Sequence, residues 1–506
     1  MKLILRIVLV VVFCGSSVHA GDKSDLQALS RIKEEAIEKS EVMQTLSHLS
    51  DVIGPRLTNS PGYGKAAEWA QLKLGEWGLE GPRLEPWGEF GRGWQVIKHS
   101  LEMTSPRYMK LTAYPKAWTK GTSGIISGKP VLVELAGEED LELWKGKLRG
   151  AIVMLGAPGD VHVGFEPNAT RYTAEELEEL SRASLRKPAG EERREENRKR
   201  REWRSRVSEF LAEEEVTAVL ESSSRRRGAV FVGSGGSRDP KEGLGLPCFV
   251  VPSEQYGMLS RIVEKEEPLE LRVELETEVF DSDLQAYNVL AELPGSDTRL
   301  QTEVVMLGAH LDSWHTGTGA TDNAAGCAVV MEAVRILKAV GGPLKRTVRI
   351  ALWSAEEQGL LGAKGYVKRH FGDPGEGEVT DEYADLSAYF NLDNGGGRIR
   401  GIYMQGNDSV RPIFRDYIEP LEDLGVSTLS IRPTGGTDHL AFDAVGLPGF
   451  QFVQDPINYS TVTHHTNLDV YEYVSEEDLM QASAVMAWFV YRTAMRDARL
   501  PRKKTN

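Results

Sequence analysis

Polar side chains that can bind a metal or move a proton gather just after a short apolar run in the middle of the chain. Residues 304–307 (VVML) precede a glycine, and His310, Asp312 and Asp322 follow soon after. A neutral imidazole is a good metal ligand, and a nearby carboxylate often holds the ring through its second nitrogen. Taken alone, this His-x-Asp pattern is weak, because a loop histidine beside a helix-capping aspartate gives the same sequence.

Three later segments carry further carboxylates and histidines, again just after apolar runs. These groups are Glu356 and Glu357 after residues 347–353, Asp393 after 388–392, and His464 and His465 in the loop after 450–453. Adjacent carboxylates point in different directions, so one can bind a metal while the other handles a proton. In isolation, an acidic pair also suits a helix start, and two adjacent histidines more often supply one ligand than two.

The apolar runs indicate the elements that must position these groups. They are short, bounded by glycine or polar residues and separated by helical patterns such as 324–340, which is typical of buried strands alternating with helices. We therefore predict an α/β fold with a mostly parallel mixed sheet that helices cover on both faces. Chemistry in such a sheet collects just past the carboxyl ends of the strands.

Together these positions form a candidate metal centre without a thiolate. The candidate ligands are His310, Asp322, Glu357, Asp393 and His465, with Glu356 left as a free carboxylate. Nitrogen and oxygen donors suit zinc in a catalytic role. Two histidines and three carboxylates are too many for one tetrahedral zinc with an open position. They suit two metal ions about 3.5–4 Å apart that share a bridging carboxylate.

The composition is that of a folded, acidic protein. Apolar residues make up 41% and charged residues 27% of the 506 residues, so a sizeable core is feasible and wholesale disorder is not expected. The length predicts two or three domains. The formal net charge of −15 argues against non-specific nucleic-acid binding.

The first twenty residues have the order of a secretory signal peptide. Basic Lys2 and Arg6 precede the apolar run 7–13, and small residues follow as far as Ala20. We therefore predict that residues 1–20 are a signal peptide and that the protein is secreted or periplasmic. Lipoprotein anchoring through Cys14 is the alternative, which the bulky residue before this cysteine disfavours.

Beyond this segment, the chain has two cysteines and no stretch of eighteen uninterrupted apolar residues. Cys248 and Cys327 would allow one disulfide, but no spacing indicates it. Cys327 lies just over one turn into the helical pattern that follows Asp322. We predict that it is a buried small side chain rather than a nucleophile.

Residues 121–270 are predicted to form a separate inserted module. Short β-rich runs recur in it, and the sequences DLELWKGKLRGAIVML, RGAVFV and LPCFVVP resemble the protease-associated domain, a small α/β insert of several exopeptidases. Residues 21–120 and 271–506, on either side of the insert, would then form one catalytic domain.

Within the insert, residues 173–219 are highly charged with mixed sign. Thr173 and Glu176 form a capping-box pattern, and Pro188 breaks the run into two helices. Apolar residues from Trp203 to Leu211 make one stripe at helical spacing. We predict a solvated helical hairpin packed over its own module, with a lid over the site as a further hypothesis.

With the candidate ligands in place, the chain resembles the co-catalytic di-zinc exopeptidases, a family that includes bacterial leucyl-type aminopeptidases and glutamate carboxypeptidases. The resemblance is carried by NVLAELPGSD, GAHLDSW, GATDNAAG, LWSAEEQGLLGA, NLDNG, GGTDH and HHTNLD, and it extends back to VIGPRL near the N-terminus. It covers nearly the whole chain after residue 20, except the charged segment 173–219. It implies the zinc-exopeptidase fold and two zinc ions as cofactors.

The resemblance also implies a role for each ligand. Asp322 bridges both zinc ions, His310 and Asp393 complete one site, and Glu357 and His465 complete the other. Two half-sites with one histidine and one carboxylate each account for four of the five ligands. The bridging role explains the remaining carboxylate.

By the same resemblance, Glu356 is the general base, which takes a proton from the metal-bridging water and passes it to the leaving amine. Asp312 orients His310. His465 rather than its neighbour His464 is the ligand, because the His-Thr-x-x-Asp pattern of the family starts at His465.

Four further residues are predicted to contact the substrate: Asp438, His439, Tyr459 and His464. The first two belong to the GGTDH sequence, which the resemblance places near the cleft. Tyr459 or His464 is the candidate donor to the tetrahedral oxyanion. His315, another histidine of the first loop, is expected to be exposed at the surface.

The sequence therefore predicts a secreted zinc-dependent exopeptidase that hydrolyses dipeptides or short peptides, has no nucleic-acid partner and is compatible with a homodimer. Trimming from the amino or the carboxyl end stays open. One alternative is a single-zinc acyltransferase of the glutaminyl-cyclase type on the same fold, and another is a non-catalytic, receptor-like homologue. The complete ligand set together with Glu356 argues against both.

Overall fold

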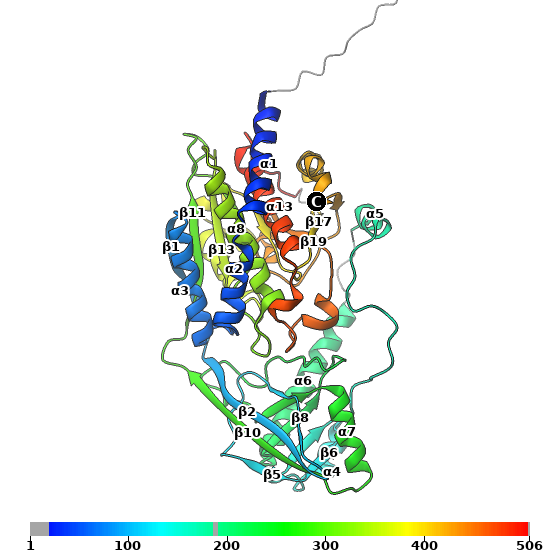
Figure 1. Ribbon diagram of the computed structural model, residues 1–506. Coiled ribbons are helices and arrows are strands. Elements are labelled where there is room, and N and C mark those ends of the chain that lie inside the picture. The colour runs from blue at the N-terminus through cyan, green and yellow to red at the C-terminus, as the bar shows by residue number, and fades with distance from the viewer. Residues whose placement is uncertain (1–19, 186–190, 504–506) are drawn as a thin grey trace, which may run out of the picture.

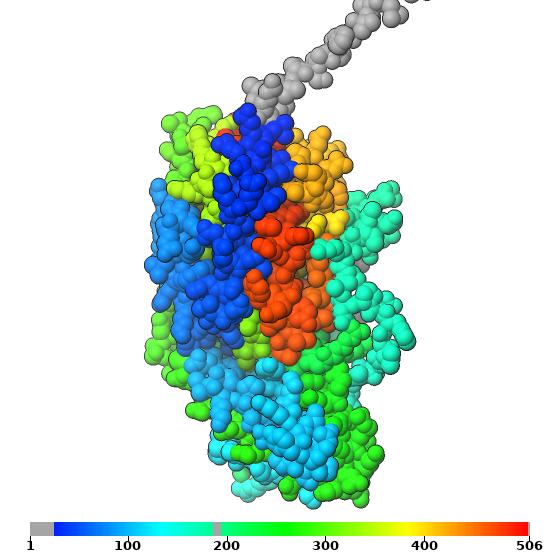
Figure 2. All heavy atoms as spheres, in the orientation of Figure 1, coloured from blue at the N-terminus to red at the C-terminus, as the bar shows by residue number. Residues whose placement is uncertain are grey.

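The computed structural model describes residues 20–185 and 191–503. It contains a large body built on an eight-stranded sheet and a second body, at one end of the molecule, with two smaller sheets (Figures 1 and 2). Apart from Ala20, the predicted signal peptide with Cys14 lies outside the described residues, so it stays a prediction. Among the described helices, none combines the length and the apolar character needed to cross a membrane.

The eight-stranded sheet positions the candidate ligands. Its strand order is β1 (Glu80–Glu89), β11 (Gln285–Leu293), β13 (Thr347–Trp353), β12 (Val304–His310), β16 (Leu386–Asn391), β19 (Gly449–Gln454), β17 (Ile399–Tyr403) and β18 (Thr428–Ser430). The four central strands, β13, β12, β16 and β19, run parallel to one another. The outer pairings β1–β11, β11–β13 and β19–β17 are antiparallel. The predicted α/β fold with a mostly parallel mixed sheet is confirmed.

Alternate residues of the central strands point to opposite faces of this sheet, as the two-residue repeat of a strand requires. In β12, Val305 and Leu307 belong to one core, whereas Met306 belongs to the other. Both faces are therefore buried, which explains why the strand sequences are continuously apolar.

Helices cover each face of the sheet. The larger core is shared with α1 (Ala20–Glu38), α2 (Val42–Ser47), α3 (Pro61–Glu76), α8 (Ala325–Val340), α11 (Arg411–Ile418) and α13 (Glu476–Met495). The smaller core is shared with α9 (Leu361–His370) and α12 (His439–Ala444). The α8 helix is buried over most of its length, so the loop before it has a fixed base.

The second body contains two sheets that share one core. The four-stranded sheet has the order β3 (Met109–Lys110), β2 (Gly93–Ser105), β10 (Glu270–Phe280) and β5 (Ile126–Gly128). The five-stranded sheet has the order β4 (Tyr114–Pro115), β9 (Cys248–Val251), β8 (Ala218–Ser222), β7 (Ile152–Leu155) and β6 (Pro130–Val133). Helices α4 (Glu138–Trp144) and α7 (Ser253–Glu264) complete this body. The domain limits at residues 121 and 270 stay a prediction, since β2, β3 and β4 of this body lie before residue 121 and β10 continues from residue 270 to residue 280.

The charged segment forms two helices, α5 (Ala174–Arg182) and α6 (Glu191–Glu213), as predicted. The capping box of Thr173 and Glu176 is present. However, the Ser430 hydroxyl on β18 donates to the Leu180 carbonyl at 2.7 Å, so α5 docks on the large sheet. The α6 helix lies in the second body (Figure 1), and its apolar residues belong to a core of that body. The predicted packing of the segment over its own module therefore holds for α6 and is wrong for α5, because α5 buries its apolar side against an edge strand far along the chain.

Short elements connect these layers. They are β14 (Gly372–Asp373), β15 (Glu378–Val379), α10 (Asp381–Asp385) and the short helical segments η1 (His48–Ile53), η2 (Ala320–Ala324), η3 (Asp408–Val410), η4 (Glu419–Leu424), η5 (Tyr459–Thr463) and η6 (Tyr471–Tyr473). Cys248 and Cys327 are both buried and form no disulfide within the described residues. Burial raises the pKa of the Cys327 thiol to about 12, and its sulfur lies 3.0 Å from the His310 carbonyl oxygen. The prediction that Cys327 is a buried small side chain is confirmed.

Candidate metal centre

The candidate ligands converge at one edge of the large sheet. His310 is the last residue of β12, Asp393 follows β16, and Glu357 and His465 lie on the loops that leave β13 and β19. Because these four strands are adjacent and parallel, their carboxyl ends meet. Asp322 enters this edge from η2, just before α8.

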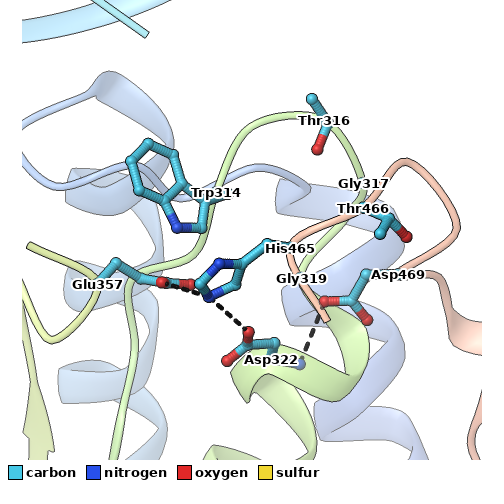
Figure 3. Close-up of a pocket in the computed structure, with 9 residues that line it drawn as sticks. All are labelled: Trp314, Thr316, Gly317, Gly319, Asp322, Glu357, His465, Thr466 and Asp469. Atoms are coloured by element: carbon cyan, nitrogen blue, oxygen red, sulfur yellow. Dashed lines mark hydrogen bonds and ion pairs between the residues drawn. The ribbon is translucent and has the colours of Figure 1, made fainter. Parts of the chain in front are cut away.

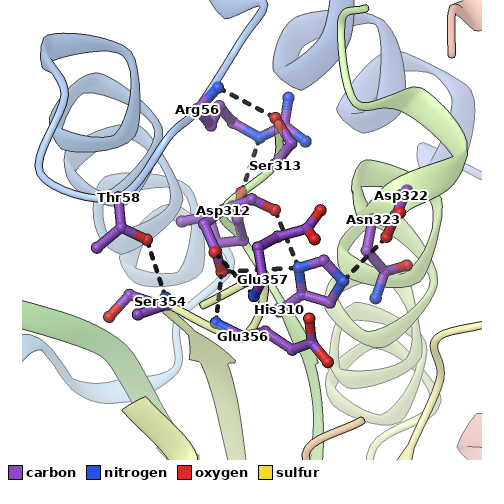
Figure 4. Close-up of polar contacts among 12 residues, drawn as sticks. Arg56, Thr58, His310, Asp312, Ser313, Asp322, Asn323, Ser354, Glu356 and Glu357 are labelled. Carbon is purple, nitrogen blue, oxygen red and sulfur yellow. Dashed lines mark hydrogen bonds and ion pairs between the residues drawn. The ribbon is translucent and has the colours of Figure 1, made fainter. Parts of the chain in front are cut away.

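One half of the centre surrounds His310 (Figure 4). The His310 Nε2 atom lies 3.2 Å from Asp322 Oδ1 and 3.4 Å from Asp393 Oδ1. Glu356 belongs to the same half, since His310, Glu356 and Asp393 place their ligand atoms within 4.8 Å of one another. All these side chains are buried.

The other half surrounds His465 (Figure 3). The His465 Nε2 atom lies 2.8 Å from Glu357 Oε2 and 3.3 Å from Asp322 Oδ2. The His464 ring stacks on the His465 ring with 3.8 Å between their centroids. A small pocket, with an empty volume of about 170 Å³, is lined by Glu357, His465 and Trp314 among other residues.

Asp322 joins the two halves, because each of its carboxylate oxygens faces a different histidine. This is the geometry that a ligand shared by two metal ions needs. Asp469 fixes it in place. The Asp469 carboxylate accepts hydrogen bonds from the backbone N–H of Thr321 at 2.6 Å and from that of Asp322 at 3.2 Å. Asp469 is therefore a positioning residue for the bridge.

Several candidate ligand atoms are buried and have no hydrogen-bond partner among the described residues: His310 Nε2, Asp322 Oδ2, Glu357 Oε1 and Asp393 Oδ1. Burial raises the pKa of Glu357, and the negative charge of Asp322 adds to the effect. Burial also raises the pKa of Glu356, with a further contribution from Asp393. Unpartnered buried groups and clustered carboxylates are both unfavourable. Two divalent cations would relieve both, so the residues present fit a two-metal site.

Asp312 holds both the first histidine and the acidic pair. The His310 Nδ1 atom lies 2.9 Å from the Asp312 carbonyl oxygen and 3.6 Å from Asp312 Oδ1. The Asp312 carboxylate also accepts hydrogen bonds from the backbone N–H of Glu356 at 3.2 Å and from that of Glu357 at 3.4 Å. The geometry supports the predicted orienting role and extends it to the loop after β13.

Arg56 is a supporting residue that reasoning from residue types missed. Its guanidinium is fully buried and donates, at 2.8–3.0 Å, to the backbone carbonyls of Leu49, Gly54, Leu311, Thr318 and Gly319. It therefore fixes the loop between His310 and Asp322 (Figure 4). The only sequence signal was its place in the VIGPRL motif of the family resemblance.

Replacing Arg56 with methionine should destabilise the protein by on the order of 3–5 kcal/mol, because buried carbonyls lose a charged donor. The melting temperature and the bound zinc, measured together, should both fall. The matched control is Arg182→Met, since this arginine side chain is 75% exposed. An unchanged melting temperature in Arg56→Met would contradict the role of Arg56.

The four predicted substrate contacts lie at two depths. Tyr459 and His464 are half-buried, with their rings edge to face at 5.0 Å. Burial, with a contribution from the Asp322 charge, raises the pKa of Tyr459, so its phenol stays a neutral donor. Asp438 and His439 are fully buried. Substrate contact stays a prediction for all four residues.

We expected His315 to be exposed at the surface, but it is not. It is partly buried, and its Nε2 atom lies 2.7 Å from the Pro115 carbonyl oxygen in β4. Its ring also meets Trp94 edge to face. The expectation was wrong because the second body packs against the first loop, and no local pattern around His315 indicates that contact.

A sequence profile places the site in a known family. The profile of peptidase family M28 matches residues 288–490, the segment that carries all five predicted ligands. This segment belongs to peptidase family M28. The predicted family resemblance is confirmed, and with it the prediction of a hydrolase that cleaves peptides.

Relatives of this M28 peptidase match most of its length. Mouse (Mus musculus) carboxypeptidase Q is 26% identical over 468 residues, which is 91% of this chain and 87% of the mouse protein. A peptidase M28 precursor from Shewanella amazonensis superposes with a TM-score of 0.68 and 24% identity, covering 96% of this chain and 100% of that one. BSAP, a zinc aminopeptidase from Bacillus subtilis, superposes with a TM-score of 0.58 and 18% identity, covering 92% and 98%. The two structures share the fold of this chain.

Proposed function

We propose that this M28 peptidase is a zinc-dependent exopeptidase that hydrolyses dipeptides or short peptides. The observation that carries the proposal is the position of Asp322, whose two carboxylate oxygens face His310 and His465 separately. Each histidine has a further carboxylate beside it, Asp393 in one half and Glu357 in the other. Relatives with zinc, aminopeptidase and carboxypeptidase in their names support the same class.

Five side chains would hold two zinc ions. His310 and Asp393 would bind one ion, Glu357 and His465 would bind the other, and Asp322 would bind both. When bound, such ions polarise the scissile carbonyl and lower the pKa of the attacking water. Asp312 and Asp469 keep the ligands in place through the hydrogen bonds described above.

Glu356 is the proposed general base. It accepts a proton from the attacking water and returns it to the leaving amine. Burial raises the pKa of this carboxyl, and a base with a raised pKa is better matched to neutral pH. The neutral phenol of Tyr459 is the proposed donor to the oxyanion, because its ring meets that of His464, which stacks on the proposed ligand His465.

The complete second half of the centre disfavours the alternative of a single-zinc acyltransferase. An enzyme with one zinc would have no use for two histidine–carboxylate groups that face one shared aspartate. A non-catalytic homologue would have no need to bury Glu356 beside the ligands. Zinc content per chain distinguishes the first alternative, and turnover distinguishes the second.

Peptides of one sequence with free, amino-blocked and carboxyl-blocked ends test the proposal. We expect the zinc-loaded enzyme to release residues only from a free end, and mass spectrometry of the products will identify which end is trimmed. Chelation of zinc should abolish release. Internal cleavage of a peptide blocked at both ends would contradict an exopeptidase.

We also propose that the protein acts outside the cytoplasm, on the pattern of residues 1–20. The enzyme for the peptide assay is therefore to be recovered from the medium or the periplasm of its host. Its retention in the cytoplasm would contradict secretion without affecting the result for the peptides.

A further inference from the structure

The chain between β7 and α5 runs from the second body to the large one (Figure 1). In its last part, Thr170 pairs with Ile457 in an antiparallel bridge, and the Thr170 N–H donates to the Ile457 carbonyl at 2.9 Å. The Thr461 hydroxyl donates to the Asn168 carbonyl at 2.5 Å. Residues 168–172, which we call the clamp, are therefore bonded to the loop that follows β19.

This loop, residues 455–465, carries three residues of the candidate site, and we call it the His465 loop. The three residues are Tyr459, His464 and His465. A Cβ atom added at Gly395 would lie 2.9 Å from the Tyr459 Cβ atom, so Tyr459 packs closely on the chain after β16. The clamp contacts the same loop on either side of Tyr459. The position of these side chains therefore depends on the contacts of the loop with the clamp.

Another part of the second body holds the end of the His465 loop. The Val232 N–H donates to the His465 carbonyl at 3.3 Å. Arg225 Nη1 donates to the Ser460 carbonyl at 2.7 Å, and Arg225 Nη2 lies 3.3 Å from His464 Nδ1. All three contacts lie at or after Ser460, so they do not hold the start of the loop.

Arg171 supplies the positive charge of the clamp. Its Nη1 atom lies 3.0 Å from Asp455 Oδ2 and 2.8 Å from Asp478 Oδ2. Asp455 is the first residue after β19, Asp478 lies in the first turn of α13, and both are buried. The Tyr172 N–H also donates to Asp455 Oδ1 at 3.1 Å. Arg171 therefore joins the start of the His465 loop to a helix of the larger core.

Each of these two carboxylates also has an arginine of the large body beside it. Arg400 Nη1 lies 3.2 Å from Asp455 Oδ1. Arg398 Nη2 lies 3.0 Å from Asp478 Oδ1. Among the described residues, Arg171 alone pairs with both carboxylates. Without Arg171, both buried charges keep a counter-ion, so the large body should still fold. What is lost is the link between the start of the His465 loop and α13.

The α5 helix fixes the other end of the clamp. Its capping box begins at Thr173, the residue directly after the clamp. Its Leu180 carbonyl accepts the hydrogen bond from Ser430 that docks α5 on the large sheet. The clamp is thus bonded to the His465 loop and, through α5, to an edge strand. Such a segment suits a fixed support better than a lid, which must open for substrate.

We propose that the clamp positions His465 for zinc, with Arg171 as its positioning residue. This rests on the proposed function, in which Glu357 and His465 bind one zinc ion. A metal ligand binds best when its surroundings hold it in the orientation that the metal needs. The His310 half of the centre is built on β12 and β16 instead. Loss of the clamp should therefore weaken the binding of one zinc ion and not of both.

Competition for zinc between the loaded enzyme and a chelating indicator tests this assignment. His465→Ala identifies the ion that belongs to this half. In Arg171→Met, the affinity for that ion should fall about 10–100-fold, the range for loss of a group that orients a metal ligand, while the affinity for the other ion keeps its wild-type value. Excess zinc should restore most of the turnover, which the loss of a catalytic group would not allow. Arg171→Lys should lose less, because its ammonium can still pair with a buried carboxylate.

Thr461→Val is a second variant, which removes the hydroxyl bonded to Asn168 and leaves every charge in place. It should weaken the binding of the same ion about 2–10-fold, the range of one hydrogen bond, and it decides the question if Arg171→Met does not fold. Arg182→Met, the control, changes an α5 side chain that is 75% exposed and should leave both affinities unchanged.

Equal losses at both ions, or no loss at either, in a folded variant of the clamp would overturn its role and leave the proposed function standing. Wild-type enzyme that binds fewer than two zinc ions would overturn the proposed metal centre, and this inference with it.

Discussion

Replacing Glu356 with glutamine should lower kcat by about 10²–10⁴-fold while the protein still folds and binds zinc. Glutamine keeps the size of the side chain but cannot accept the proton of the attacking water. The backbone hydrogen bond from residue 356 to Asp312 does not depend on the side chain, so the loop after β13 should keep its position. Steady-state kinetics on a short peptide and zinc analysis of the same sample measure the two effects.

Glu376→Gln is the matched control, because Glu376 is exposed on a distant loop and should show wild-type turnover. The proximity of Glu356 to His310 and Asp393 makes the zinc analysis decisive. A fall in zinc content would make Glu356 a ligand rather than a base. Near-normal turnover at full zinc content would remove it from catalysis.

Replacing Asp322 with alanine should reduce bound zinc from about two ions per chain to fewer than one, because both half-sites lose an oxygen ligand together. Turnover should fall with the zinc content. Mass spectrometry of elemental zinc after dialysis measures the stoichiometry, and titration with zinc measures the loss of affinity.

Asp423→Ala is the control for this replacement, since that side chain is 65% exposed and pairs with Lys33 at the surface. Its zinc content should match that of the wild type. Loss of one ion with full retention of the other would place Asp322 in one half-site only. A fully loaded Asp322→Ala protein would exclude it as a ligand altogether.

The convergence of the candidate ligands could be predicted, because four of them follow apolar runs that form adjacent parallel strands of the large sheet. His310 ends β12 and Asp393 follows β16, and these strands are direct neighbours in register. Parallel pairing turns positions far apart in the sequence into neighbours at one edge. Periodicity and residue type were therefore sufficient for this part of the site.

The packing of amphipathic segments could not be predicted in the same way. The capping box of Thr173 and Glu176 is local, and the structure has it as expected. The surface on which α5 lies depends on Ser430, 250 residues away from its partner Leu180. An apolar stripe indicates that a helix packs on something, but it does not identify the partner.

The residues that support the metal centre could not be predicted, for a related reason. Arg56 donates to backbone carbonyls, which every residue has, so its partners leave no pattern in the sequence. Arg225 is the first of three consecutive arginines, a sequence that is typical of an exposed surface. Only the fold shows that Arg225 contacts His464. Likewise, the contact of His315 with Pro115 joins two bodies and has no local signature.

The hydrogen bond from the Val232 N–H to the His465 carbonyl connects the second body directly to the metal centre. Any rotation of that body away from the large sheet would pull on the loop that carries a proposed zinc ligand. Arg56 and Arg225 also lie outside the family segment 288–490. We therefore expect residues 288–490 alone to be insufficient for activity. A shortened enzyme would also need Arg56 and the inserted body to hold the loops of the metal centre in place.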